Sequence, residues 1–361
     1  MKRWIILGLL ALLLSTNCNA QENILWEELG VDKLAQAGDT YGTGVVLSPD
    51  LELNEGLDDL ADRTAQYLPE ILRSALRGAL MLLVIVLLCA MAEGVHAAGK
   101  SGNLQVSVMA GALAIAAVSA NDMNSLMGLG RSTIDSMQGF GQVMLPVIAA
   151  VTAASGQAAG AAVRQIATAA FSNVLLALID QLLVPLVYAY VAACAAYAAV
   201  GNPGLQKVAE VLKWVANKLL TILLVGFVTY LTVSGVIAGN TDAAALKVAK
   251  AAISSVVPVV GRIIADAAES VLVGAGLLRN TVGIFGMMAV LGICIVPFLQ
   301  LGLHYLIYKL SAALASTMAD SRLGELINGI GTAFGMILGM TGASALLLLI
   351  SIVSGLAGGG V

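Results

Sequence analysis

The chain has 361 residues, of which 59% are hydrophobic and 11% charged, and its mean hydropathy is +0.93. Soluble domains carry about twice this share of charge, so the composition excludes a soluble globular protein and indicates a membrane protein with several spans. The net charge of −4 is unevenly distributed: about eleven acidic residues and one basic residue, Lys33, lie in residues 21–62, and basic residues outnumber acidic ones from Arg63 onward. Because the basic residues are scattered between apolar runs, we expect no nucleic acid among the partners.

Residues that commonly carry chemistry are few. Cys18 lies in the N-terminal apolar segment, and Cys89, Cys194 and Cys294 lie singly in later apolar runs, without a CxxC spacing. The two histidines are far apart in the sequence, and no nucleophile, zinc-protease or phosphate-loop motif occurs. We therefore expect no enzyme activity, no catalytic residue, no cofactor and no metal site.

Residues 1–20 have the pattern of a cleavable signal peptide. Two basic residues precede an apolar run from Trp4 to Leu14, and the small residue Ala20 fits the cleavage position. Cleavage there places the mature N-terminus outside the cytoplasm. An uncleaved membrane anchor and a lipoprotein cleavage before Cys18 are the alternatives.

Residues 21–56 form a short acidic segment, for which we expect an extracytoplasmic location. It contains a turn-rich sequence from Asp39 to Gly44, followed by the helix-start signal of Ser48 and Pro49. The segment is too short for a large core of its own, so we predict a flexible lead into the membrane domain of residues 57–361. That domain begins with an amphipathic helix over residues 57–75, in which apolar residues recur at three- and four-residue steps.

The apolar runs that follow predict an all-α polytopic membrane protein with six to eight transmembrane helices and amphipathic helices between them. A polar link over residues 123–142 separates the second and third spans. A second amphipathic stripe, residues 205–219, precedes a later span. Outside residues 166–200, the predicted spans cover residues 76–92, 104–120, 143–163, 219–238, 281–310 and 330–356.

Residues 166–200 are too long for one straight span and short for two. Asp180, Gln181 and Pro185 near the middle favour a broken helix or a tight hairpin. Two crossings here place the lysines at 207, 213 and 218 in the cytoplasm, as the positive-inside rule prefers. A single crossing reverses everything downstream, so the side of the C-terminus stays open.

Charges interrupt apolar sequence most clearly between Ile253 and Gly286. Arg262, Asp266 and Glu269 lie at i, i+4 and i+7, so a helix presents all three on one face. A charge at bilayer depth costs about 2.5 to 3.5 kcal/mol, so this face would contact a partner, the bundle interior or water. An amphipathic helix in the headgroups is the alternative. With Asp180, these three residues are the candidates for a polar path or a subunit contact.

Small residues predict close helix packing in two places. Gly331, Gly335 and Gly339 recur at four-residue steps, as do Gly156 and Gly160, and each series lets another helix approach closely. The partner can be a helix of this chain or another subunit. Prolines in similar apolar surroundings, in residues 141–156 and 254–269, also leave open an internal repeat of the kind found in transporters.

The order of these features resembles the stage III sporulation protein AE family of endospore-forming bacteria. The resemblance rests on the sequence LPEILRSALRG at the first span, on the block VVPVVGRIIADAAESVLVGAGLLRNTVG, and on a glycine-rich apolar end. It extends from about Gly56 to the C-terminus. The acidic segment before it matches poorly.

The resemblance implies a multi-pass component of a channel or secretion-like complex in the mother-cell membrane around the forespore, which supports late forespore gene expression. The implied partners are the other proteins of the operon, including an ATPase, ring-forming proteins and small membrane subunits, together with membrane lipid and a protein from the forespore. It implies no catalytic residues. The alternative function is a stand-alone permease that moves a small solute through its own helical bundle.

Overall fold

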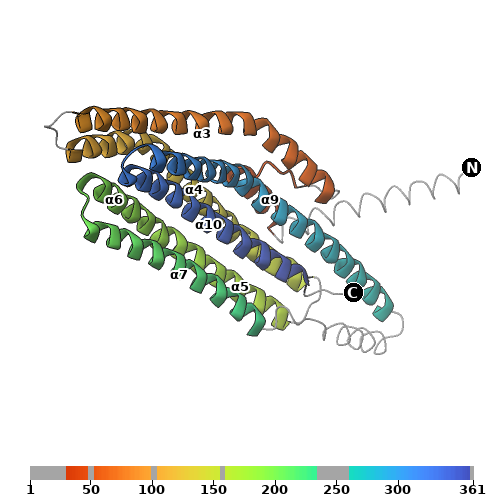
Figure 1. The fold of residues 1–361 in the computed structure, drawn as a ribbon. Coiled ribbons are helices and arrows are strands. Elements are labelled where there is room, and N and C mark those ends of the chain that lie inside the picture. The colour runs from red at the N-terminus through yellow and green to blue at the C-terminus, as the bar shows by residue number, and fades with distance from the viewer. Residues whose placement is uncertain (1–29, 48–52, 99–103, 155–158, 234–259, 358–361) are drawn as a thin grey trace, which may run out of the picture.

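The described part of the chain is a bundle of long helices (Figure 1). This computed structural model describes residues 30–47, 53–98, 104–154, 159–233 and 260–357, so the predicted signal peptide lies outside the description. The helices are α2 (Val31–Thr40), α3 (Leu53–Ala98), α4 (Leu104–Ala154), α5 (Ala159–Leu178), the π-helical turn η1 (Ile179–Leu183), α6 (Val184–Val200), α7 (Pro203–Val233), α9 (Val260–Met318) and α10 (Ser321–Ala357). Among the described residues, six segments are long and apolar enough to cross a membrane. The predicted all-α polytopic fold is therefore confirmed.

Successive long helices run in opposite directions (Figure 1). Two short turns reverse the chain, one between α6 and α7 and one between α9 and α10. In the first, Gly201 adopts φ 71°, where a Cβ is disfavoured, and Pro203 begins α7 at a position where no helical N–H bond is lost. The Gly201 N–H donates to the Tyr197 carbonyl at 2.7 Å. At the other turn, Asp320 precedes α10 and its carboxylate accepts from the Arg322 N–H at 2.9 Å.

The predicted division of residues 104–163 into two spans is wrong, because α4 is a single helix of 51 residues. The supposed link continues the helix because its apolar residues keep a helical period: Met127, Ile134 and Met137 are fully buried, with polar residues between them. Before Pro146 this stretch contains no proline to stop the helix. Asn121 and Asp122, which directly follow the predicted span 104–120, lie inside the helix.

Of the two alternatives for residues 166–200, the tight hairpin is wrong, and the structure contains the interrupted helix. Helices α5 and α6 continue one another through η1, and the chain keeps its direction (Figure 1). Pro185 lacks the N–H that would donate to the carbonyl of Gln181, and its ring crowds that carbonyl. The backbone therefore widens into one π-helical turn immediately before the proline instead of reversing.

The two findings together fix where the lysines at the start of α7 lie. One helix replaces two in α4, and residues 166–200 cross once, which is one of the two alternatives that the sequence leaves open. The lysine-bearing start of α7 therefore lies at the same end of the bundle as the end of α3 and the start of α4. The turn between α9 and α10 lies at the same end (Figure 1). We call this end of the bundle, which contains the start of α7 and the turn between α9 and α10, the hairpin end.

Residues 30–47 are not the flexible lead that the sequence predicts. Val31, Leu34 and Ala37 of α2 are buried and belong to the main hydrophobic core. The predicted turn after α2 is present, and in it the Thr43 N–H and hydroxyl both donate to the Gly38 carbonyl, at 3.0 and 3.1 Å. Gly292 of α9 packs directly against the Thr43 backbone. The segment is thus fixed between the long helices.

Large side chains fill the bundle between the helices. The largest that are fully buried are Tyr308, Phe140, Phe227, Phe285 and Phe334. Phe334 of α10 meets the Tyr308 ring of α9 edge-on, with the ring centroids 5.1 Å apart. Such packing makes α9 and α10 the central pair of the bundle, and α4 packs on both.

Candidate functional site

Asp180, the first predicted site residue, forms an ion pair at the π-helical turn. Its carboxylate accepts from the Arg131 Nε at 3.0 Å and from Nη2 at 3.5 Å, a two-point geometry that fits the guanidinium fork. The pair joins α4 to η1. The sequence does not predict Arg131 as the partner of Asp180, because Arg131 lies in residues 123–142, the predicted link between two spans.

The exposure of this ion pair decides what it can do. The Asp180 side chain is 10% exposed and the Arg131 side chain 53%, so the guanidinium lies on the outer surface of the bundle. Asp135, one turn along α4, also acts electrostatically on Arg131. The Arg131 guanidinium therefore faces away from the bundle. The polar path and the subunit contact both stay predictions for Asp180.

For Arg262, Asp266 and Glu269, the three charged residues predicted on one helix face, the structure describes the backbone only. Helix α9 includes Arg262, Asp266 and Glu269, as the predicted helix requires, but the description of side chains on α9 begins at Asn280. Pro258 lies outside the described residues. The polar path and the subunit contact therefore both stay predictions for these three side chains.

The glycine series on α10 lies against two different helices. A Cβ added at Gly331 would lie 3.1 Å from the Tyr308 Cβ, and one added at Gly335 would lie 2.8 Å from the Tyr305 ring, so both positions face α9. Gly339 instead faces Leu220 of α7, with 3.8 Å to its Cδ2. Gly156 lies outside the described residues, and Gly160 is described only as part of α5. Gly331 and Gly335 thus serve packing within this chain, whereas Gly339 is exposed.

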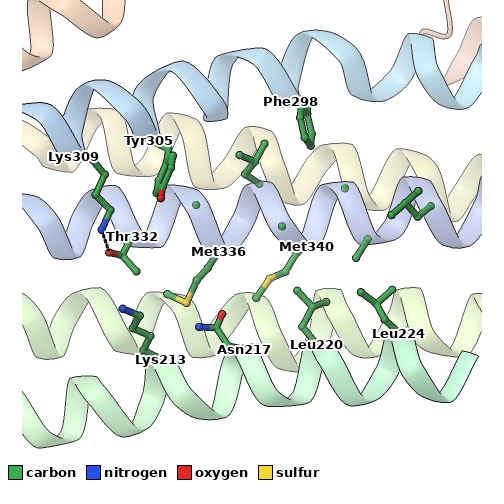
Figure 2. A pocket seen from close by; sticks show the side chains of 16 residues that line it. Lys213, Asn217, Leu220, Leu224, Phe298, Tyr305, Lys309, Thr332, Met336 and Met340 are labelled. Carbon is green, nitrogen blue, oxygen red and sulfur yellow. Dashed lines mark hydrogen bonds between the residues drawn. The ribbon is translucent and has the colours of Figure 1, made fainter. Parts of the chain in front are cut away.

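A groove lies between α7 and α9, with α10 as its floor, and has a volume of about 660 Å³ (Figure 2). Lys213 and Asn217 of α7 and Lys309 of α9 lie at one end of it. The Lys309 Nζ donates to the Asn328 Oδ1 and to the Thr332 hydroxyl, each at 2.7 Å. The rest of the groove is mostly apolar.

The sequence analysis missed this groove. Lys213, Asn217, Leu220 and Leu224 follow a helical period that could have indicated one continuous face of α7. The opposite wall could not be predicted, because Lys309 comes from a helix far along the chain and its approach depends on how α7 and α9 both pack on α10.

A third polar contact joins the helices near the hairpin end. The buried Tyr308 hydroxyl of α9 donates to the Asp122 Oδ2 of α4 at 2.7 Å. The bond satisfies a hydroxyl that would be costly to bury without a partner. Its role is to fix α4 against α9. Among the described residues, no group of three potential metal ligands is present.

The family model for stage III sporulation protein AE matches residues 51–359 of this chain. The chain belongs to this family. Among known proteins, the stage III sporulation protein AE of Bacillus subtilis (strain 168) is 28% identical over 194 residues. That match covers 54% of this chain and 49% of the relative, so the matched region spans about half the length of each. No solved structure matches the chain.

The stage III sporulation protein AE region contains every long helix described here. It includes the Arg131–Asp180 pair, the α10 glycines and the groove of α7, α9 and α10. Helix α2, at residues 31–40, precedes the region that matches the family. The sites described above therefore lie within the matched region, while the buried α2 precedes it.

Proposed function

We propose that the chain is an integral membrane component of the channel or secretion-like complex that links mother cell and forespore and supports late forespore gene expression. The observation that carries this proposal is the family match over residues 51–359. The chain would lie in the mother-cell membrane that surrounds the forespore. Its partners would be other stage III sporulation proteins, namely an ATPase, ring-forming proteins and small membrane subunits.

The placement of polar groups supports a structural role over a solute path within one chain. A permease predicts polar side chains that converge on a central cavity. Among the described residues, the Arg131 guanidinium instead lies on the outer surface, and the centre of the bundle is filled by Phe140, Phe334 and Tyr308. In this function the chain acts on no substrate and is not an enzyme.

The outer surface offers room for other subunits. Helix α7 lies at the edge of the bundle and leaves Val211, Trp214, Ile222 and Val225 more than half exposed. Such an apolar face suits either lipid or a helix of another membrane protein. The hairpin end would face the mother-cell cytoplasm, because it carries the lysines of α7 together with Lys309 and Arg322.

Affinity purification of the tagged protein from sporulating membranes in mild detergent tests the proposal. We expect the ATPase and ring-forming proteins to be retained and to be absent when an unrelated membrane protein carries the tag. Recovery of the chain alone, under conditions that keep a known membrane complex intact, contradicts the proposal. Solute flux through liposomes that contain only this protein would then establish the permease alternative.

A further inference from the structure

We propose that the groove between α7 and α9 binds one anionic phospholipid, with the headgroup phosphate at Lys213 and Lys309 and an acyl chain along the floor of α10. This goes beyond the proposed place in a complex and does not depend on it. It is a property of the chain by itself.

The charges at the mouth of the groove call for an anion. Lys213 and Lys309 act electrostatically on each other, and like charges so placed repel. Neither ammonium forms a salt bridge within the described residues. Of the nearby carboxylates, Glu210 pairs with Lys207 at 2.9 Å, and Glu325 accepts a hydrogen bond from the neutral Gln206 amide at 3.4 Å. A phosphate between the two lysines would relieve the repulsion and accept hydrogen bonds from both.

The mouth lies where the hydrocarbon layer should begin. Beyond Lys218, the described part of α7 carries no charged side chain. The same holds for α10 after Glu325 and for α9 from Asn280 to Tyr308. All three walls therefore change from charged to wholly uncharged sequence close to the two lysines, as expected at the boundary between headgroups and acyl chains.

The body of the groove fits an acyl chain. From Thr332 to Leu346 its floor runs along about 21 Å of α10 at 1.5 Å per residue, which exceeds the roughly 15 Å depth of one leaflet's hydrocarbon. Leu220 and Leu224 form one wall and Phe298 the other (Figure 2). The exposed Gly339 leaves the middle of the floor without a side chain.

The two lysines at one end of the groove favour a lipid over a helix of a second copy or of another subunit. A phospholipid combines an anionic headgroup, which the lysines would attract, with hydrocarbon that suits the apolar remainder of the groove.

Native mass spectrometry of the full-length protein with phosphatidylglycerol or phosphatidylcholine of identical acyl chains tests the headgroup site. We expect a preference for phosphatidylglycerol, and the double variant Lys213→Gln/Lys309→Gln to weaken its binding about 25-fold, at about fivefold for each lysine. Lys213→Arg/Lys309→Arg should retain binding, and Lys218→Gln, on the same helix but outside the groove, should change nothing. Equal binding of the two lipids, or unchanged binding by the Gln/Gln variant, overturns the proposal.

Gly339→Leu tests the acyl-chain site independently of the charges. Its Cβ would make only an ordinary contact, 3.8 Å to Leu220, so the variant should fold and place its side chain in the groove. We expect binding of both lipids to fall, whereas Gly226→Leu, a glycine on α7 that faces open space, should bind as the wild type does. Unchanged binding by Gly339→Leu overturns the proposal. So does a disulfide that joins Gly339→Cys to a helix of another protein or a second copy in native membranes.

Discussion

Asp320 determines where α10 begins. Its carboxylate accepts from the Arg322 N–H at 2.9 Å and from the guanidinium at 3.1 and 3.2 Å, so it satisfies a helix N–H that would otherwise lack a partner. We expect Asp320→Ala to lower the free energy of unfolding in detergent by about 1 kcal/mol at neutral pH. Asp58→Ala, at an exposed position in α3, is the control and should have little effect.

The same residue makes this contribution depend on pH. The hydrogen bond from the Arg322 side chain holds the pKa of the Asp320 carboxyl below its usual range. A carboxyl whose pKa is lower in the folded state stabilises that state above its usual pKa of about 3.9, and this is lost as the pH falls through the lower, folded value. The difference between wild type and Asp320→Ala should therefore shrink in strong acid. A difference that stays constant there would contradict the assignment.

The Arg131–Asp180 ion pair can be tested by removing one of its charges or both. Asp180→Asn leaves the Arg131 guanidinium without its ionised partner in an apolar setting, so we expect a lower midpoint of thermal unfolding. Replacement of both partners by uncharged residues removes the unpaired charge, so Arg131→Met/Asp180→Asn should recover most of the loss. Additive losses in the double variant would show that the two residues act separately.

Single residues also show what sequence alone could and could not predict. Asp180 was predicted as a site residue because a carboxylate in an apolar run is conspicuous. Lys213 and Lys309 were not paired, because they lie on helices far apart in the chain and nothing in the sequence fixes which helices become neighbours.

At the scale of elements, α2 is held by a contact that tolerates little change. Gly292 packs against the Thr43 backbone, which cannot move aside as a flexible side chain can. We expect Gly292→Ala to cost about 1 to 3 kcal/mol of stability and to make residues 30–47 more accessible to protease. Gly302→Ala, on the same helix, would meet Leu338 at an ordinary 3.9 Å and should leave the protease pattern unchanged. Equal patterns in both variants would show that α2 is not docked as described.

The errors in the predicted elements share one physical cause. The sequence predicts breaks at the polar residues of 123–142 and at the proline in 166–200, yet neighbouring helices stabilise both segments as helix. Burial of Met127, Ile134 and Met137 outweighs the polar composition of the first segment. A π-helical turn accommodates Pro185 in the second. The local sequence indicates that both segments differ from an ordinary transmembrane helix. It does not indicate that packing against neighbouring helices keeps each segment helical.

At the scale of the whole molecule, the continuity of α4 fixes the side of the membrane on which each connection lies. If six helices cross, Ala154 at the end of α4 lies on the opposite side from Asn202 and Ala319, which both lie at the hairpin end. We expect single cysteines at positions 202 and 319 to react with an impermeant thiol reagent from one side, and a cysteine at 154 to react only from the other. The background is a variant without native cysteines that still supports sporulation. The predicted topology with separate spans at 104–120 and 143–163 instead places residues 123–142 on that other side and position 154 inside a span. Labelling of Ser132→Cys from that side, with no labelling of a cysteine at 154, would therefore refute a continuous α4. Because the lysines of the groove lie toward the hairpin end, the same labelling shows which leaflet would supply its lipid.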